Sequence, residues 1–172
     1  IIPILLPAKT QGSHFTGLEI QEEMPEMADR GARLNKITDR VEICQGDLKE
    51  ASAIFGASSF DVVTCNPPYM NQNHGLKNPD DAKAIARHEV LCTLEDVIRE
   101  SARCLKPGGR FAMVHRPHRL AEMMRLMAAY GLEPKRIRMV HPYVESEANM
   151  VLLEASRGGN PWMKAEPPVI VF

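Results

Sequence analysis

The sequence lacks long apolar runs and a dense cysteine framework. Its longest apolar stretches are far too short to cross a bilayer, which takes about 20 consecutive apolar residues. Its four cysteines show no CxxC spacing, so they suggest neither a metal site nor a disulfide scaffold. Three of them stand in apolar runs or on an apolar helix face, which is typical of reduced, buried thiols. We therefore predict a cytoplasmic protein without a metal ion or a membrane anchor.

An excess of charge of either sign is also missing. Lys and Arg number 21 against 22 Asp and Glu, and the formal net charge is −1. The sequence therefore gives no global signal for nucleic acid, and any such contact must depend on a local patch. The best candidate is the basic stretch from His115 to His141. A phosphate-binding patch and an ordinary solvated surface explain that stretch equally well.

Size and composition are those of an ordinary globular protein. The chain has 172 residues, of which 44% are apolar and 25% are charged, enough for one domain with its own core. Internal repeats, low-complexity tracts and linker-like segments are absent from it. We therefore predict a single domain over residues 1–172.

Strand-like and helix-like segments alternate along most of the chain. We expect strands at 14–20, 41–44, 60–65 and 110–115, and helices at 1–9, 21–36, 48–55, 93–105 and 117–130. This alternation predicts an α/β fold with a mostly parallel sheet and helices on both faces. Two strands at 135–140 and 149–155 follow each other directly, which predicts an antiparallel pair. A loop at 158–168 and a short edge strand at 169–172 complete the chain.

Three local details can be read from these segments. Pro7 should kink or shorten the first helix. Thr93 should cap the helix that follows it, with Asp96 in its acidic first turn. The predicted inward side of the helix at 21–36 is formed by Met24, Met27, Ala28 and Leu34.

Acidic residues stand at the ends of two successive predicted strands. Glu19 ends one strand, and Asp47 closely follows the next. In nucleotide-binding α/β folds an acid at such a position accepts hydrogen bonds from ribose hydroxyls. Asp47 could accept from the amino group of an adenine, with Leu48 packed on the ring. Each acid alone could instead be a helix N-terminal residue that interacts with the helix dipole, but their pairing favours ligand binding.

The tetrapeptide Asn66-Pro67-Pro68-Tyr69 directly follows the apolar run from Phe60 to Cys65. Proline has no N–H group and a fixed φ, so the Asn66 side-chain oxygen and the Pro67 carbonyl can point outward as acceptors. Two converging acceptors suit the hydrogens of a planar NH₂ group, and the Tyr69 ring can stack on a flat substrate. The simpler alternative is a proline-rich turn in which Tyr69 packs on the core.

This tetrapeptide resembles the signature of methyltransferases that act on planar amino nitrogens, including adenine-N6 and protein-glutamine-N5 enzymes. Several other segments occur with it in a fixed order: HFTGLEI, Gly46-Asp47, FDVVTCNPPYM, Ala86–Glu89, LKPGGRF and ESEANMVLLEA. Together they resemble the bacterial adenine-N6 methyltransferases that modify valine tRNA beside the anticodon. Arg87-His88-Glu89 and Ser146–Asn149 point to this branch.

The resemblance implies a Rossmann-like class I methyltransferase fold whose last strand is antiparallel. It implies S-adenosyl-L-methionine as cofactor and tRNA as partner. Glu19, Ile20, Asp47, Leu48 and Asn66 would bind the cofactor, and Asn66, Pro67, Pro68 and Tyr69 would carry the methyl transfer. It also implies a first strand and a glycine-rich turn upstream of Ile1, where the sequence already reads like the interior of a helix.

Two other functions are compatible with these residues. Protein-glutamine N5 methylation also has a planar NH₂ acceptor, so the tetrapeptide does not discriminate against it. A non-catalytic binding module with the same fold would account for the missing glycine-rich turn.

Overall fold

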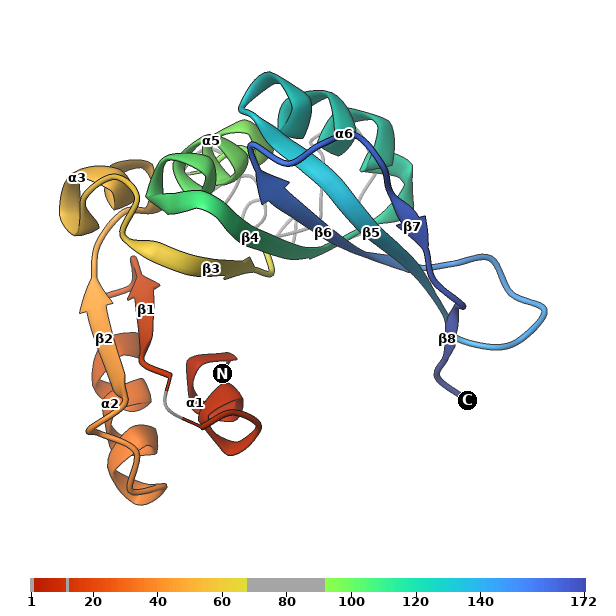
Figure 1. Cartoon of the computed structure of the whole chain (residues 1–172). Helices are drawn as coiled ribbons and strands as arrows, with labels where there is room; N and C mark the ends of the chain where they lie inside the picture. Colours follow the sequence, from red (N-terminus) through yellow and green to blue (C-terminus); the bar gives the residue numbers. More distant parts are fainter. Residues whose placement is uncertain (1, 12, 68–91) are drawn as a thin grey trace, which may run out of the picture. The chain divides into compact units, whose positions relative to one another are not determined.

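The computed structural model describes residues 2–11, 13–67 and 92–172 (Figure 1). The chain consists of two compact units, one from Ile1 to Ile54 and the other from Phe55 to Phe172. None of the helices in the described ranges combines the length and the apolar character that a membrane span requires.

The first unit contains a two-stranded parallel sheet and short helices. Strands β1 (Phe15–Glu19) and β2 (Val41–Gln45) pair with Glu19 opposite Gln45. The helical segments are α1 (Ile2–Leu5), η1 (Leu6–Ala8), α2 (Met24–Leu34), η2 (Leu48–Glu50) and α3 (Ala51–Phe55), the last at the boundary of the two units. The predicted effect of Pro7 is confirmed, because the first α-helix ends before it and a single 3-10 turn follows.

Helix α2 packs through small residues, which differs from our prediction. Met27 and Leu34 were expected to face inward, but they are 55% and 84% exposed. Ala32 is the fully buried residue of the helix. A Cβ on Gly31 would come within 2.9 Å of the Ile4 Cδ1 atom in α1. The small residues Gly31 and Ala32 therefore lie on the packed side of α2, and the larger apolar side chains remain at the surface.

The second unit contains a six-stranded mixed sheet with the order β3-β4-β6-β5-β7, and β8 also pairs with β5. Its strands are β3 (Phe60–Cys65), β4 (Leu105–His115), β5 (Leu132–His141), β6 (Met150–Arg157), β7 (Lys164–Ala165) and β8 (Val169–Ile170). Strands β3 and β4 are parallel, and β6 is antiparallel to both β4 and β5. The predicted antiparallel pair of the last two long strands is therefore confirmed.

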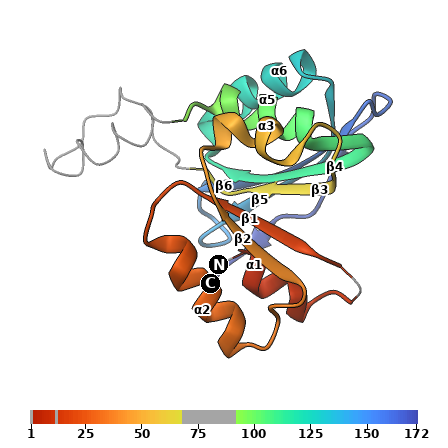
Figure 2. The same ribbon diagram turned by 90° about the vertical axis from the view of Figure 1, so that its left-hand side faces the viewer.

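Helices α5 (Leu94–Cys104) and α6 (Leu120–Ala129) cover one face of this sheet (Figure 2). The 3-10 turn η3 (Pro117–Arg119) precedes α6. The crossovers from β3 to β4 and from β4 to β5 step in the same direction, and right-handed crossovers of that kind place their helices on one face. Alternate residues of β4 and β6 are 0–3% exposed and form the core: Phe111, Met113, Val151, Leu153 and Ala155.

Strand β4 begins earlier than the sequence predicts. The segment Lys106–Gly109 ends the helix as expected, but it already belongs to β4, which starts at Leu105 and not at Arg110. The register of β3 against β4 shifts at this point. Gly108 has a φ of +76°, which suits glycine and lets the extra residues bulge out of the ladder.

The predicted loop at 158–168 contains the short strand β7. The next residue, Glu166, accepts a hydrogen bond from Arg136 Nε at 2.9 Å and also pairs with Arg138. The bond from Arg136 is the main reason why the pKa of Glu166 falls to about 2. Because these arginines belong to β5, a tertiary interaction holds the segment against the sheet. The local sequence of the segment has no pattern that would predict a strand there.

Arg157, the last residue of β6, links the sheet to the C-terminal end of α5. Its Nη1 atom donates to the Leu105 carbonyl and, at 3.0 Å, to the Ser58 hydroxyl. The Arg103 carbonyl lies 3.5 Å from the same atom. Carbonyls at a helix C-terminus lack intrahelical donors and carry partial negative charge, so a guanidinium group stabilises them.

We expect Arg157→Met to lower the free energy of unfolding by about 1–3 kcal/mol, because it keeps the apolar stem and removes the guanidinium donor to the Leu105 carbonyl and the Ser58 hydroxyl. Urea denaturation measures the change. The matched control is Arg110→Met, an exposed arginine of the same sheet, for which we expect less than about 0.5 kcal/mol. Equal losses in the two variants would contradict the role of Arg157.

Candidate functional site

The two predicted acidic residues lie at one edge of the sheet in the first unit. Parallel strands end at the same edge, and Glu19 is the last residue of β1. Asp47 comes two residues after the end of β2. The Gly46 N–H donates to the Glu19 carbonyl at 2.9 Å, which joins the two strand ends directly. The structure thus places the two acids next to each other in space.

Gly46 stands where two apolar side chains meet the junction. A Cβ atom at this position would come 2.7 Å from Ile54 Cδ1 and 3.0 Å from Leu18 Cδ1. Both distances are shorter than ordinary van der Waals contact, so a larger residue would force the ends of these two side chains to move.

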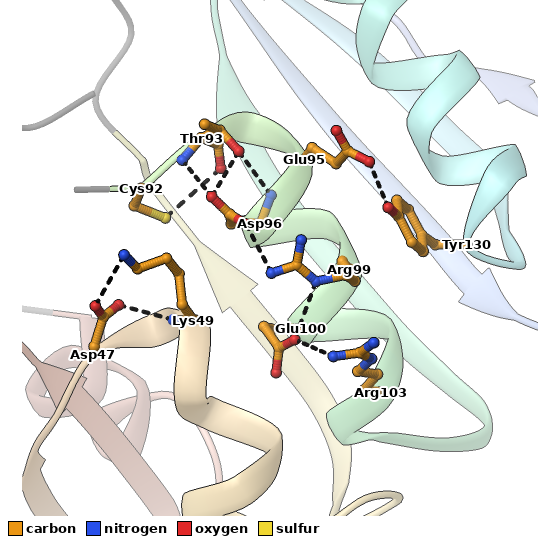
Figure 3. A network of polar contacts seen from close by, with 10 residues as sticks. All are labelled: Asp47, Lys49, Cys92, Thr93, Glu95, Asp96, Arg99, Glu100, Arg103 and Tyr130. Atoms are coloured by element: carbon orange, nitrogen blue, oxygen red, sulfur yellow. Dashed lines mark hydrogen bonds and ion pairs between the residues drawn. The ribbon is translucent and has the colours of Figure 1, made fainter. Parts of the chain in front are cut away.

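Backbone N–H groups hold each acid in a defined orientation. Glu19 Oε1 accepts from Gln21 N at 3.2 Å. Asp47 caps η2 by accepting from Lys49 N at 2.9 Å, and the Lys49 ammonium lies 3.4 Å from the other carboxylate oxygen (Figure 3). The helix-capping alternative therefore describes Asp47 correctly. A carboxylate has about four lone-pair sites, so these bonds leave acceptor capacity on both groups.

Apolar surface adjoins both acids. Ile20 follows Glu19 and is 40% exposed, and Leu48 follows Asp47 and is half-buried. An exposed isoleucine beside a carboxylate offers an apolar surface and a hydrogen-bond acceptor next to each other. That combination suits a nucleoside.

Asn66 and Pro67 lie at the carboxyl end of β3 in the second unit. The strand ends at Cys65, opposite Met113 of β4. Asn66 is exposed, whereas Pro67 is buried, so the proline anchors the elbow and Asn66 lies at the surface. Pro68 and Tyr69, like Arg87-His88-Glu89, lie outside the described residues.

His115 ends β4 at the same edge, and the sequence analysis placed it in the basic stretch. It is 1% exposed, and its Nδ1 accepts from Arg116 N at 2.8 Å. Burial, followed by the positive charges of Arg119 and His118, lowers the pKa of His115 to about 4. It is therefore neutral at pH 7 and adds no charge to the basic stretch. The sequence signal for its burial was its position in the alternating pattern of apolar residues along β4.

Carboxylates neutralise much of the basic stretch. Arg119 makes two hydrogen bonds of 2.8 Å to Glu122. Arg136 pairs with Glu154 at 3.1 Å and with Glu166 at 2.9 Å. These ion pairs favour the solvated-surface interpretation. Within the ranges that the structure describes, no cluster of three or more His, Cys, Asp or Glu could hold a metal ion.

The N-terminus of α5 lies at the same edge of the second sheet as Asn66, because the helix of a crossover runs antiparallel to its strands. The predicted cap is confirmed: Thr93 Oγ1 accepts from Asp96 N at 3.1 Å, and Asp96 Oδ2 accepts from Thr93 N at 2.9 Å (Figure 3). Burial alone would raise the pKa of Asp96. The bonds from Thr93 and from Arg99, at 2.7 Å, outweigh it and lower that pKa.

Comparisons with known proteins agree with this arrangement. A family described as "Methyltransferase domain" matches residues 4–154. Among solved structures, a predicted O-methyltransferase from Agrobacterium tumefaciens has a TM-score of 0.75 and 22% identity, over 97% of this chain and 73% of its own. Geranyl diphosphate C-methyltransferase from Streptomyces coelicolor, in complex with S-adenosyl-L-homocysteine, has a TM-score of 0.63 and 16% identity, over 90% and 66%. These likenesses show a class I methyltransferase fold.

Relatives with closer sequences carry one name. A protein of Porphyromonas gingivalis is 29% identical over 90% of this chain and 60% of its own length. A protein of Aeromonas salmonicida is 31% identical over 70% and 49%. Both are named tRNA1(Val) (adenine(37)-N6)-methyltransferase. The chain spans about 60% of the length of the first of these relatives.

We expect the Thr93–Asp96 cap to give α5 a pH-dependent contribution to stability. A folded-state pKa below the ordinary value of about 3.9 stabilises the protein above that value, and the contribution is lost as the pH falls through the lowered pKa. Asp96→Asn should therefore cost about 0.5–2 kcal/mol at neutral pH, and the difference from the wild type should shrink as the pH falls below the ordinary pKa of the carboxyl group. Urea denaturation across this range measures it.

The matched control is Asp61→Asn, which removes an 80% exposed carboxylate paired with Lys106. Exposed pairs of this kind contribute less than about 1 kcal/mol. A constant difference between Asp96→Asn and the wild type at every pH would contradict the prediction.

Proposed function

The chain belongs to the methyltransferase-domain family, and from this premise we propose that it transfers a methyl group from S-adenosyl-L-methionine to the N6 atom of an adenine in tRNA. The observation that carries the proposal is the exposed Asn66 on a buried proline elbow at the carboxyl end of β3. The shared name of the relatives supports valine tRNA as the substrate and the nucleotide beside its anticodon as the target. A tRNA substrate also favours a cytoplasmic location.

The residues at the edge of the first sheet fit the cofactor. Glu19 accepts hydrogen bonds from the ribose hydroxyls, and Asp47 accepts from the amino group of the cofactor's adenine. Ile20 and Leu48 provide apolar contact to the ring. The exposure of Ile20 and the fixed orientation of both carboxylates support this assignment. When bound, S-adenosyl-L-methionine supplies an electrophilic methyl group on a sulfonium.

The acceptor nitrogen is held by the elbow. Adenine must leave its stack to reach a protein pocket. The Asn66 side-chain oxygen and the Pro67 carbonyl then accept the two N6 hydrogens, which orients the nitrogen lone pair toward the methyl group. Alignment of the reacting atoms supplies much of the acceleration. A strong base is not required before attack, because the N6 proton becomes acidic only after the N–C bond forms.

Two other functions are tested by the same assay. A glutamine side chain of a release factor also presents a planar NH₂, and a non-catalytic module would transfer nothing. Labelled S-adenosyl-L-methionine is incubated with the full-length protein and either tRNA or release factor. We expect label in tRNA, as N6-methyladenosine. Label only in release factor, or in neither, would overturn the proposal.

Asn66→Ala should remove most turnover and lower cofactor affinity much less than Asp47→Ala does, because it deletes one acceptor for the N6 hydrogens and leaves both predicted cofactor acids in place. Single-turnover methylation and cofactor titration measure the two quantities. Asp47→Ala is the reciprocal control, with weakened cofactor binding. Equal loss of turnover and cofactor affinity in Asn66→Ala would contradict the assignment.

Tyr69→Ala should lower kcat/KM, because it removes the stacking of the ring on one base. Such stacking contributes about 1–3 kcal/mol. Tyr69→Phe keeps the π-face and should retain most of the activity. Methylation kinetics with tRNA compare the two variants. Full activity in Tyr69→Ala would show that no flat substrate lies against this ring.

A further inference from the structure

Two of the four cysteines lie together beside the proposed acceptor site. Cys65 is the last residue of β3 and directly precedes Asn66. Cys92 directly precedes Thr93, the N-cap of α5. The helix of this crossover runs antiparallel to its strands, so its first turn returns to the edge at which β3 ends. Residues separated by a long stretch of sequence thus meet at one corner of the sheet.

The two thiols are close enough to interact electrostatically. The pKa of Cys65 is raised to about 12, first by burial and then by the charge of Cys92. In Figure 3 the Cys92 side chain lies beside the pale yellow end of β3, and its sulfur is 3.7 Å from the Thr93 carbonyl. Both are half-buried and neither belongs to a disulfide.

The other two cysteines have different neighbours. Cys44 lies on β2, where Glu42 is the charged group that acts on its pKa. Cys104 is buried at the end of α5, where Glu100 has that role. Neither has a second thiol among the groups that shift its pKa, so proximity of two sulfurs is a property of Cys65 and Cys92. Cys44 and Cys104 provide matched controls within the same chain.

We propose that Cys65 and Cys92 form a dithiol site that hydroperoxides convert reversibly into a disulfide. One thiol of the pair attacks a peroxide oxygen, the O–O bond breaks, and a sulfenic acid and one water form, with the thiol proton leaving in that water. The sulfur of the other thiol then displaces the sulfenic oxygen, which leaves with that thiol's proton as a second water. Two thiols lose two electrons and two protons, and one hydrogen peroxide becomes two waters.

The disulfide would constrain the acceptor site directly. Cys65 is bonded to Asn66, so a link to Cys92 would tie the elbow to the cap of α5. It would also close the chain between these two cysteines into a covalent loop. A thiol reductant would reopen that loop, since exchange proceeds through a mixed disulfide. The proposal concerns the two thiols and holds whichever substrate the protein methylates.

The test measures the cross-link by mass spectrometry. The full-length protein is treated with hydrogen peroxide, remaining thiols are blocked with N-ethylmaleimide, and the digest is analysed with and without reduction. We expect one intramolecular Cys65–Cys92 peptide pair that disappears on reduction. Cys44→Ser and Cys104→Ser should leave that pair intact, whereas Cys65→Ser and Cys92→Ser should abolish it. The readout does not depend on methyl transfer, so it is distinct from failure of the proposed function.

A second measurement uses a dithiol-specific probe on the untreated wild type. Phenylarsine oxide bridges two neighbouring thiols, and we expect one equivalent to bind and to protect both Cys65 and Cys92 from N-ethylmaleimide. This arm needs no substitution at a half-buried position, so misfolded variants cannot mimic its outcome. Oxidation that gives only separate sulfenic acids, or cross-links that involve Cys44 or Cys104, would overturn the proposal, as would labelling of both thiols in the presence of the arsenical.

Discussion

Parallel hydrogen bonding between neighbouring strands positions the candidate functional residues. Parallel strands present their carboxyl ends at a single edge. Residues just past these ends are no longer held by the hydrogen bonds between the strands. In the first unit this places Glu19 next to the segment that carries Asp47. In the second it places Asn66 beside the end of β4 and the start of α5. The positions of these candidate residues therefore follow from the direction of the strands.

The second unit shows how a small core supports that edge. Phe111 and Val151 belong to β4 and β6 and are fully buried under the two helices. The antiparallel insertion of β6 gives β4 and β5 a common neighbour. Arg157 then joins the far end of β6 to the C-terminus of α5. These contacts fix the helix whose capped N-terminus lies near Asn66.

Charge in this protein serves mainly to hold elements together. Arg119, Arg136 and Arg138 belong to the most basic stretch of the sequence, yet each pairs with a glutamate. His115 is neutral because burial disfavours its charged form. The basic stretch as a whole is therefore weak support for the proposed contact with tRNA. The count of basic residues could not reveal this, because the partners of Arg136 and Arg138, Glu154 and Glu166, lie on other segments of the chain.

Local sequence determined the alternation of strands and helices, the Thr93 cap, the effect of Pro7 and the acids at two strand ends, because each depends on neighbouring residues and on periodicity. The turn at Asn66 was likewise predicted from two prolines that follow an apolar run. Only tertiary structure decided that α2 packs through Ala32 and Gly31, that Glu166 holds a short strand on β5, that β4 begins at Leu105, and that Cys92 returns to Cys65. Those outcomes depend on which distant segments meet, and pairing between segments far apart in the chain leaves no local pattern in either one.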